Sequence, residues 1–214
     1  MHKTINVAIL IYPGVEVVDM NGPIDVFMKA NRYNKNRYHV FTVAESAGIV
    51  QSEEEAVQIK PKFTLKNCPP PDIIVIPGQV MPQGSPRPFG NGSETLVHWI
   101  KNQGQNTGTT IMSVCVGAYI LAHTGLLNGK KVTTHWQAIE SLQKEYPKLI
   151  LIKNVRYVAD GQFVTTGGVT SGIDGALFLI SKIDGPSIAQ EVADVMVYNR
   201  DAPLPPDTIL PDSK

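Results

Sequence analysis

Three side chains in this sequence have the chemistry of a nucleophilic site with proton transfer: Cys115, Asp19 and His135. Cys115 follows an apolar, β-prone run and precedes a stretch of small residues that is compatible with a helix. At a sharp strand-to-helix turn, the N–H groups of the helix N-terminus lower a thiol's pKa and supply oxyanion donors. The sequence therefore favours Cys115 as a nucleophile. The alternative is a buried structural cysteine, because free cysteine packs as a small hydrophobic residue.

Asp19 follows the first apolar strand, where a helix is expected to begin. An N-cap or first-turn carboxylate is the ordinary structural role of Asp at such a position. Because Asp19 and Cys115 both lie at carboxyl ends of predicted central strands, we expect them to share one crevice, where Asp19 transfers a proton. Glu16 is the second candidate carboxylate, and Asp25 is expected to be a structural helix residue.

His135 follows a pair of threonines, and Trp136 follows His135. A single histidine is more often structural than reactive, so a chemical role for His135 stays a hypothesis. Trp136 is expected in the core or at an interface, with a pocket wall as the alternative. The histidines show neither an i,i+4 pair nor the Cys/His spacing of a zinc site, so we predict no metal and no cofactor.

The composition is that of an ordinary soluble globular protein. The chain has 214 residues, 43% of them hydrophobic and 18% charged, with a formal net charge of zero. Without a basic surplus, nucleic-acid binding is not expected. No apolar run has the length of a membrane span, and the N-terminus lacks the apolar region of a signal peptide. The two cysteines form no disulfide framework, which indicates a reducing, cytoplasmic compartment.

Apolar runs alternate with helix-compatible segments along the chain. This alternation predicts one doubly wound α/β sandwich with a mostly parallel central sheet, similar to flavodoxin. Residues 1–200 are expected to form this domain, and residues 201–214 a proline-rich tail. A hairpin over 157–164 is expected, with a type I′ turn at Asp160 and Gly161. The expected strands cover 5–11, 38–43, 72–76 and 109–115, and the expected helices cover 19–30, 93–104, short segments before 125 and before 147, a segment ending at 180, and 187–198.

Six segments, in this order, resemble the ThiJ/PfpI superfamily, which has the class-I glutamine-amidotransferase-like fold. The pattern is most similar to the isonitrile hydratase branch and to the amidase-like domains of some AraC-type regulators. Each segment alone is weak, but their order and spacing are specific for the superfamily. They are residues 18–27, 74–78, 113–117, 125–130, 133–136 and 166–174.

The resemblance implies that Asp19 approaches the sulfur of Cys115, hydrogen-bonds to a thiolate and delivers a proton to the substrate. It also implies an oxyanion hole made by the backbone N–H groups of Gly78 and Val116. Several members of the superfamily place the histidine equivalent to His135 near the cysteine.

The sequence departs from the superfamily pattern in the same region. Members of the hydratase branch commonly carry Thr, and proteases and amidases His, where this chain has Val116. Gln79 replaces the second glycine of a common Pro-Gly-Gly turn, and we expect it to bring an amide into the pocket. At the entry to a helix, Thr170 or Ser171 is expected as the cap, with a position at the border of the pocket as the alternative for Thr170.

Three functions follow as expectations. The first is an enzyme that hydrates an isonitrile to an N-substituted formamide, with small glyoxals or amides as other substrates. The second is a redox sensor with an oxidisable Cys115. The third is the ligand-binding domain of a regulator, which is disfavoured because no helix-turn-helix region follows before Lys214. The expected partners are a small-molecule substrate and a second copy of the chain, without nucleic acid or membrane.

Overall fold

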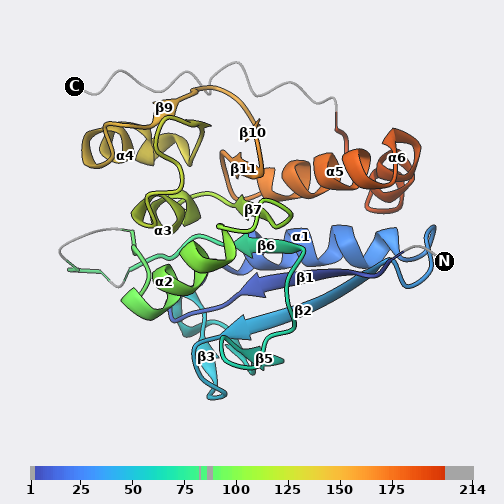
Figure 1. The fold of residues 1–214 in the computed structure, drawn as a ribbon, viewed down its shortest axis with the longest axis horizontal. Helices are drawn as coiled ribbons and strands as arrows, with labels where there is room; N and C mark the ends of the chain where they lie inside the picture. Colours follow the sequence, from blue (N-terminus) through green and yellow to red (C-terminus); the bar gives the residue numbers. More distant parts are fainter. Residues whose placement is uncertain (1–2, 82, 86–88, 201–214) are drawn as a thin grey trace.

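The computed structural model of this protein describes residues 3–81, 83–85 and 89–200 (Figure 1). The predicted tail, 201–214, lies outside the described residues. The extent of the domain over 1–200 stays a prediction.

One seven-stranded sheet organises the fold, in the order β10-β11-β7-β6-β1-β2-β5. All neighbouring pairs in this sheet are parallel except β10 and β11, which form an antiparallel hairpin. The doubly wound, mostly parallel sheet predicted from the sequence is therefore confirmed. Its strands are β1 (Ile5–Leu10), β2 (Tyr38–Ala44), β5 (Phe63–Thr64), β6 (Ile73–Ile76), β7 (Thr110–Ser113), β10 (Tyr157–Asp160) and β11 (Phe163–Thr166).

The helices form two groups around the sheet. One group contains α1, α5 and α6, which contact one another, and α2 contacts α3 in the other (Figure 1). The central strands β6 and β7 are buried almost throughout, as expected for a parallel sheet covered on both faces. The helices are α1 (Val17–Ala30), α2 (Glu94–Gln103), α3 (Gly117–His123), α4 (Ile139–Glu145), α5 (Ser171–Ile183) and α6 (Pro186–Val195).

Two local predictions differ from the structure. In the hairpin, Asp160 pairs with Phe163, so the two loop residues are Gly161 and Gln162. Of these loop residues only Gly161 has a positive φ, whereas a type I′ turn needs two. Thr170 occupies the N-cap position of α5, but its side chain makes no capping hydrogen bond. By contrast, the Ser93 hydroxyl caps α2 by accepting a hydrogen bond from the Leu96 N–H at 3.1 Å.

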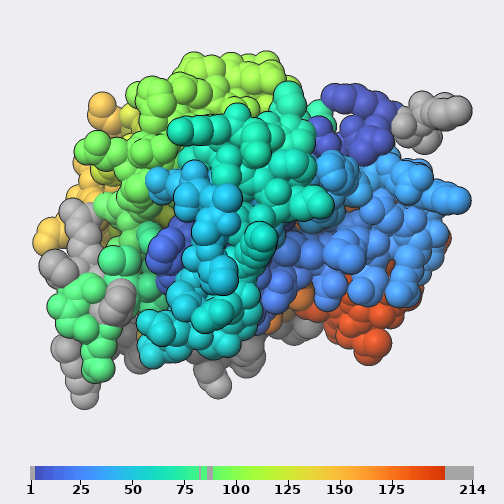
Figure 2. Space-filling view, turned by 90° about the horizontal axis from the view of Figure 1, so that it is seen from below, coloured from blue at the N-terminus to red at the C-terminus, as the bar shows by residue number. Residues whose placement is uncertain are grey.

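Two short ribbons were not predicted because their strands are only two residues long. In one, β3 (Val50–Gln51) pairs with β4 (Gln58–Ile59), and the 3₁₀ turn η1 (Glu53–Glu55) lies between them. In the other, β8 (Lys131–Val132) pairs with β9 (Ile150–Leu151), and η2 (Trp136–Ala138) precedes α4. In the space-filling view, the cyan segment that contains η1 lies at the surface (Figure 2).

Gly117 lets the first turn of α3 approach the end of β6 closely. A Cβ atom at this position would lie 2.1 Å from the carbonyl oxygen of Ile76 and 2.5 Å from that of Pro77. Both neighbours are backbone atoms, which cannot rotate away as a side chain could. The glycine after Val116 is therefore required by the packing of the strand-to-helix turn.

We expect Gly117→Ala to lower the free energy of unfolding by about 3 kcal/mol, because backbone must shift to relieve the overlap. Gly48→Ala is the matched control, since the nearest atom to its added Cβ is Ser46 Oγ at 3.6 Å. The control should change stability by no more than about 1 kcal/mol. Urea unfolding measures both, and equal stabilities of the two variants would show that the close approach is not a constraint.

Candidate active site

Cys115 occupies the turn between β7 and α3 with a positive φ of 55°. Residues other than glycine rarely adopt this left-handed region, and holding one there costs about 1–2 kcal/mol. The strand-to-helix turn predicted from the sequence is therefore present, and it is a strained one. Such strain persists only where the surrounding structure fixes the backbone.

Hydrogen bonds from neighbouring strands and loops fix this turn. The Cys115 N–H donates to the carbonyl oxygen of Thr166 at 3.2 Å, and the Thr134 hydroxyl donates to the Cys115 carbonyl at 2.8 Å. One residue earlier, the Val114 N–H donates to the Ile76 carbonyl at 2.9 Å. The hydroxyl of Thr134 thus has a clear role that sequence analysis missed. The Thr-Thr pair before His135 was the available signal.

Cys115 is 7% exposed, and the environment of its thiol favours the neutral form. Burial is the main cause that raises the pKa of Cys115, and the nearby Asp19 raises it further. The N–H of Val116 donates to the sulfur and acts in the opposite direction. The sequence predicted a lowered pKa from the helix N-terminus. In the folded chain burial outweighs that effect.

Asp19 is fully buried in the first turn of α1. Its Oδ2 accepts a hydrogen bond from the Gly78 N–H at 2.7 Å, and its Oδ1 has no hydrogen-bond partner among the residues that the structure describes. Burial is the largest cause that raises the pKa of Asp19 well above its usual value; the Gly78 N–H lowers it. The environment therefore favours the neutral form of Asp19, and its buried Oδ1 is left without a hydrogen-bond partner in the described part of the chain.

Gly78 supports the acid rather than presenting a free oxyanion donor. Its N–H is occupied by Asp19, whereas the sequence placed this group in an oxyanion hole. A Cβ atom here would lie 2.8 Å from Asp19 Oδ2 and 2.9 Å from Val116 Cγ2. Glycine is therefore needed where the acid, the Pro-Gly turn and the residue after the cysteine meet. The Val116 N–H is hydrogen-bonded to the sulfur of Cys115, and its role as an oxyanion donor stays a prediction.

Tyr12, at the end of β1, is a second buried polar residue beside Asp19. Its hydroxyl donates to the Pro77 carbonyl, which connects the end of β1 to the turn after β6. Burial raises the pKa of Tyr12, and the neighbouring Asp19 adds to the rise. Sequence analysis did not select Tyr12. The only signal was its position before Pro13 and Gly14, at a predicted strand end.

Glu16 caps the N-terminus of α1, with its Oε1 accepting from the Val18 N–H at 3.4 Å. Its backbone N–H donates to the Gly78 carbonyl at 3.0 Å. The Glu16 carboxyl is hydrogen-bonded to Glu53, and burial together with Glu53 raises the pKa of Glu16 to about 7. Glu53 was not selected from the sequence because its acidic run, 53–55, resembles a solvated loop.

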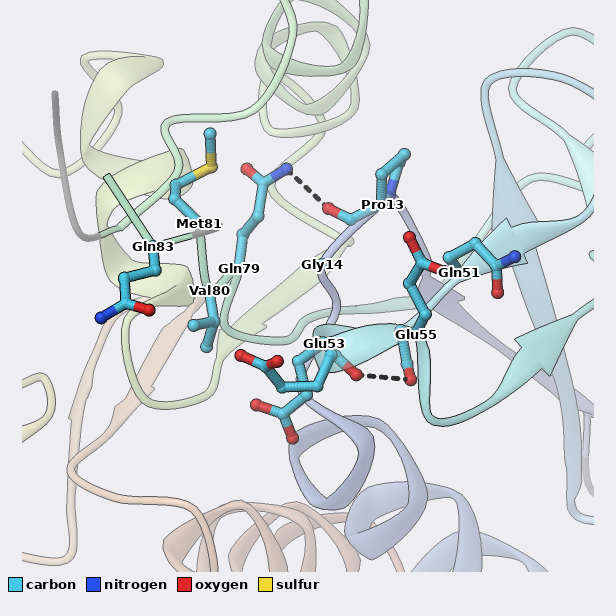
Figure 3. Close-up of a pocket in the computed structure, with 11 residues that line it drawn as sticks. Pro13, Gly14, Gln51, Glu53, Glu55, Gln79, Val80, Met81 and Gln83 are labelled. Atoms are coloured by element: carbon cyan, nitrogen blue, oxygen red, sulfur yellow. Dashed lines mark hydrogen bonds between the residues drawn. The ribbon is translucent and has the colours of Figure 1, made fainter. Parts of the chain in front are cut away.

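A cavity of about 520 Å³ opens beside this site (Figure 3). Gln79 lines this cavity, whereas Cys115 and Asp19 do not. The Gln79 amide is held in place: Nε2 donates to the Pro13 carbonyl at 3.0 Å, and Oε1 accepts from the Gly92 N–H at 3.3 Å. Glu53 lies across the cavity from this amide (Figure 3). The lining residues are Pro13, Gly14, Gln51, Ser52, Glu53, Glu54, Glu55, Gln79, Val80, Met81 and Gln83.

His135 lies on a separate, smaller cavity of about 200 Å³. Trp136, which is 40% exposed, lines the same cavity, so it forms a pocket wall rather than part of the core. Burial lowers the pKa of His135, which favours the neutral imidazole. Thr170 is exposed at the start of α5. A direct chemical role of His135 or Thr170 stays a prediction.

Within residues 3–81, 83–85 and 89–200, His, Cys, Asp and Glu side chains nowhere gather in a group of three that could hold a metal ion. The described part of the chain also contains no helix long and apolar enough to cross a membrane.

The fold belongs to a known class. The DJ-1/PfpI family profile matches residues 5–182, and the chain belongs to this family. The chain is 33% identical over 214 residues to isonitrile hydratase from Pseudomonas putida, and the match covers 98% of this chain and 84% of the relative.

Transcriptional regulators and solved structures are also similar to this chain in sequence or in fold. The transcriptional regulator CdhR from Pseudomonas aeruginosa is 27% identical, and the match covers 91% of this chain but 55% of CdhR. A ThiJ/PfpI family protein from Pseudomonas syringae has a TM-score of 0.78 and 26% identity, covering 94% of this chain and 78% of that one. Drosophila melanogaster DJ-1beta, at 20% identity and a TM-score of 0.75, shares the fold and matches 92% of this chain and all of its own.

The buried acid predicts how stability depends on pH. Because the folded chain raises the pKa of Asp19, it keeps a proton that the unfolded chain releases above about pH 4. The resulting stabilisation is complete below the unfolded pKa and is lost as the pH rises toward the folded pKa. The side chain in Asp19→Asn cannot ionise. Between about pH 5 and about pH 8, the unfolding free energy of this variant should therefore fall by less than that of wild type, and the difference between the two decreases should be about 1 kcal/mol or more.

Urea unfolding at these two pH values measures the effect. Asp25→Asn is the matched control, because Asp25 lies on the same helix with a side chain 57% exposed. The control should follow the wild-type pH dependence. Identical pH dependences of wild type and Asp19→Asn would contradict the assignment of a protonated Asp19.

Proposed function

We propose that this protein is a cysteine-dependent enzyme that hydrates an isonitrile to an N-substituted formamide. The observation that carries the proposal is a strained cysteine turn at Cys115 beside the buried carboxyl group of Asp19. The similarity to isonitrile hydratase over nearly the whole chain supports the same activity. The proposal includes cytoplasmic localisation and a homodimer.

In the first step, the sulfur of Cys115 forms a bond to the terminal carbon of the isonitrile. Asp19 gives its proton to that carbon and receives the proton of the thiol, so that Asp19 ends protonated again. The product is a thioimidate with a carbon–nitrogen double bond. No charged group needs to exist in the buried site before substrate arrives, in accord with the raised pKa values of both groups.

In the second step, water adds to the thioimidate carbon. One water proton passes to nitrogen by way of Asp19, and a tetrahedral intermediate forms. The Val116 N–H stabilises negative charge that develops on its oxygen. Collapse of the intermediate breaks the carbon–sulfur bond, the hydroxyl proton returns to sulfur, and the N-substituted formamide leaves. Together, the two steps convert one isonitrile and one water molecule to one N-substituted formamide.

The test is a turnover panel with an alkyl isonitrile, methylglyoxal and a simple amide, followed by mass spectrometry. Wild type should convert the isonitrile, and Cys115→Ala should lose at least about a thousandfold of that rate, as removal of a nucleophile does. Cys68→Ala is the matched control, since Cys68 is a half-buried cysteine in a loop. Conversion of none of the three substrates by wild type would overturn the assignment.

The side chain at position 116 is expected to limit the rate of isonitrile hydration. Its Cγ2 packs toward Gly78, so an apolar surface lies where the hydratase branch commonly presents a hydroxyl. We expect Val116→Thr to raise kcat by about two- to tenfold, because the added hydroxyl would position the attacking water. Val116→Ala removes bulk without adding a hydroxyl and should not show this gain. A Val116→Thr enzyme slower than Val116→Ala would contradict this role of the position.

A redox sensor is the second candidate, favoured by the free Oδ1 of Asp19, which can donate to an oxidised sulfur. A sensor would gain oxygen atoms at Cys115 on peroxide treatment and turn over no substrate. The chain spans about half the length of the regulators that it matches.

A further inference from the structure

Trp136 presents an aromatic surface that the proposed function does not use. The residue is 40% exposed, and its ring lies against that of His135, with 5.5 Å between the ring centroids. Both rings line the cavity of about 200 Å³, and Ile139 and Val155 add apolar side chains to the same lining. Aromatic rings of this kind form the grooves that bind proline-rich segments.

A second cavity, of about 330 Å³, continues the first one along α4. Ile139 belongs to the lining of both cavities, and α4 and β9 contact each other there (Figure 1). The two cavities form one groove, the α4 groove, which extends from Trp136 to Lys153.

The charged residues of the α4 groove all line its second cavity. They are two lysines, Lys144 and Lys153, and one acid, Glu140. Both lysines are exposed, and neither forms an ion pair with a carboxylate in the described part of the chain. This end of the groove therefore offers unpaired positive charge to an acidic occupant.

The C-terminal end of the described chain is fixed beside the other end of the groove. The Tyr198 hydroxyl donates to Asp174 Oδ2 at 2.8 Å. Arg156 Nη1 donates to the same carboxylate oxygen at 2.9 Å and to the Tyr198 hydroxyl at 3.1 Å. Asp174 is buried, and Arg156 directly follows Val155, which lines the groove. The chain that follows Tyr198 therefore starts next to the α4 groove.

Residues 201–214 have the composition and the length to fill this groove. They contain four prolines, three aspartates and one lysine. Proline-rich segments favour the extended polyproline conformation, so they bind aromatic grooves with little loss of conformational entropy. Fourteen residues at about 3.1 Å each reach about 40 Å, whereas the seven residues of α4 span about 10 Å. The excess of aspartate complements the two lysines.

We infer that residues 201–214 bind the α4 groove of their own chain, with prolines against Trp136 and aspartates near Lys144 and Lys153. Thr134 lines the Trp136 end of the groove, and its hydroxyl donates to the Cys115 carbonyl. The bound tail therefore covers the His135 side of the candidate site. The inference does not rest on the proposed function, because none of these contacts involves a substrate.

The first test locates the tail in the full-length chain. The protein is made with 5-fluorotryptophan, and a nitroxide is attached to Ser213→Cys in a Cys68→Ala background, in which Cys115 is buried. The ¹⁹F signal of Trp136 should be broadened much more strongly than that of Trp99, the second tryptophan, which lies on α2. Equal signals of Trp136 before and after reduction of the nitroxide would overturn the inference.

A mixed sample shows whose tail occupies the groove. Spin-labelled chains without fluorine and fluorinated chains without a spin label are unfolded together in urea and refolded. The Trp136 signal should then keep its full intensity, because each tail returns to its own chain. Broadening in this mixture would place the tail of a second copy in the groove and overturn binding within one chain.

The second test measures how often the tail is free. Thermolysin cleaves before leucine and isoleucine, which occur in the tail over 204–210, and its rate follows the population of the unbound tail. Trp136→Ala should accelerate this cleavage about three- to tenfold, because the prolines lose their aromatic partner. Trp136→Tyr keeps an aromatic ring and should stay within about twofold of wild type.

The lysines are tested in the same assay. The double variant Lys144→Glu, Lys153→Glu should also accelerate cleavage about three- to tenfold, because like charges repel the aspartates. Lys101→Glu is the matched control, since Lys101 is an exposed lysine on α2 outside the groove, and its rate should equal that of wild type. Cleavage at the wild-type rate in both Trp136→Ala and the double variant would overturn the inference.

Discussion

The backbone of Cys115 is the constraint on which the rest of the site depends. Its positive φ is stabilised by hydrogen bonds to Thr166 and from Thr134, which belong to different parts of the chain. Gly117 makes this turn possible by letting α3 approach the end of β6 without overlap. A relaxed backbone at this residue would move the sulfur away from Asp19. The parallel sheet therefore works as a rigid support for one strained residue.

Burial explains the electrostatic character of the site. Cys115 and Asp19 are each more stable in their neutral forms, and each opposes ionisation of the other. An isonitrile suits such a site because it is uncharged and because its terminal carbon accepts both a nucleophile and a proton. The two oxygens of Asp19 differ in their surroundings. Oδ2 accepts a hydrogen bond from the Gly78 N–H, and Oδ1 has no hydrogen-bond partner among the described residues.

The sequence was sufficient for the sheet and for the positions of the two main candidate residues. Apolar runs predicted the central strands, and the strand ends located Asp19 and Cys115. It was not sufficient for Thr134 and Glu53, whose roles depend on contacts between segments distant in the sequence. The expected lowering of the thiol pKa was wrong. Sequence reasoning could not predict that burial raises it, because the depth of burial depends on the packing of the whole chain. The same holds for Gly78, whose N–H has a single buried acceptor that only the fold reveals.

Covalent addition of an isonitrile to Cys115 is the central claim, and trapping the adduct tests it most directly. Wild-type protein would be mixed with an alkyl isonitrile, quenched in acid within one turnover, and analysed by intact and peptide mass spectrometry. The account predicts a gain equal to the whole mass of the isonitrile, because addition has no leaving group, located on the peptide that contains Cys115. Formamide production without any mass gain on that peptide, or with the gain on another residue, would contradict it.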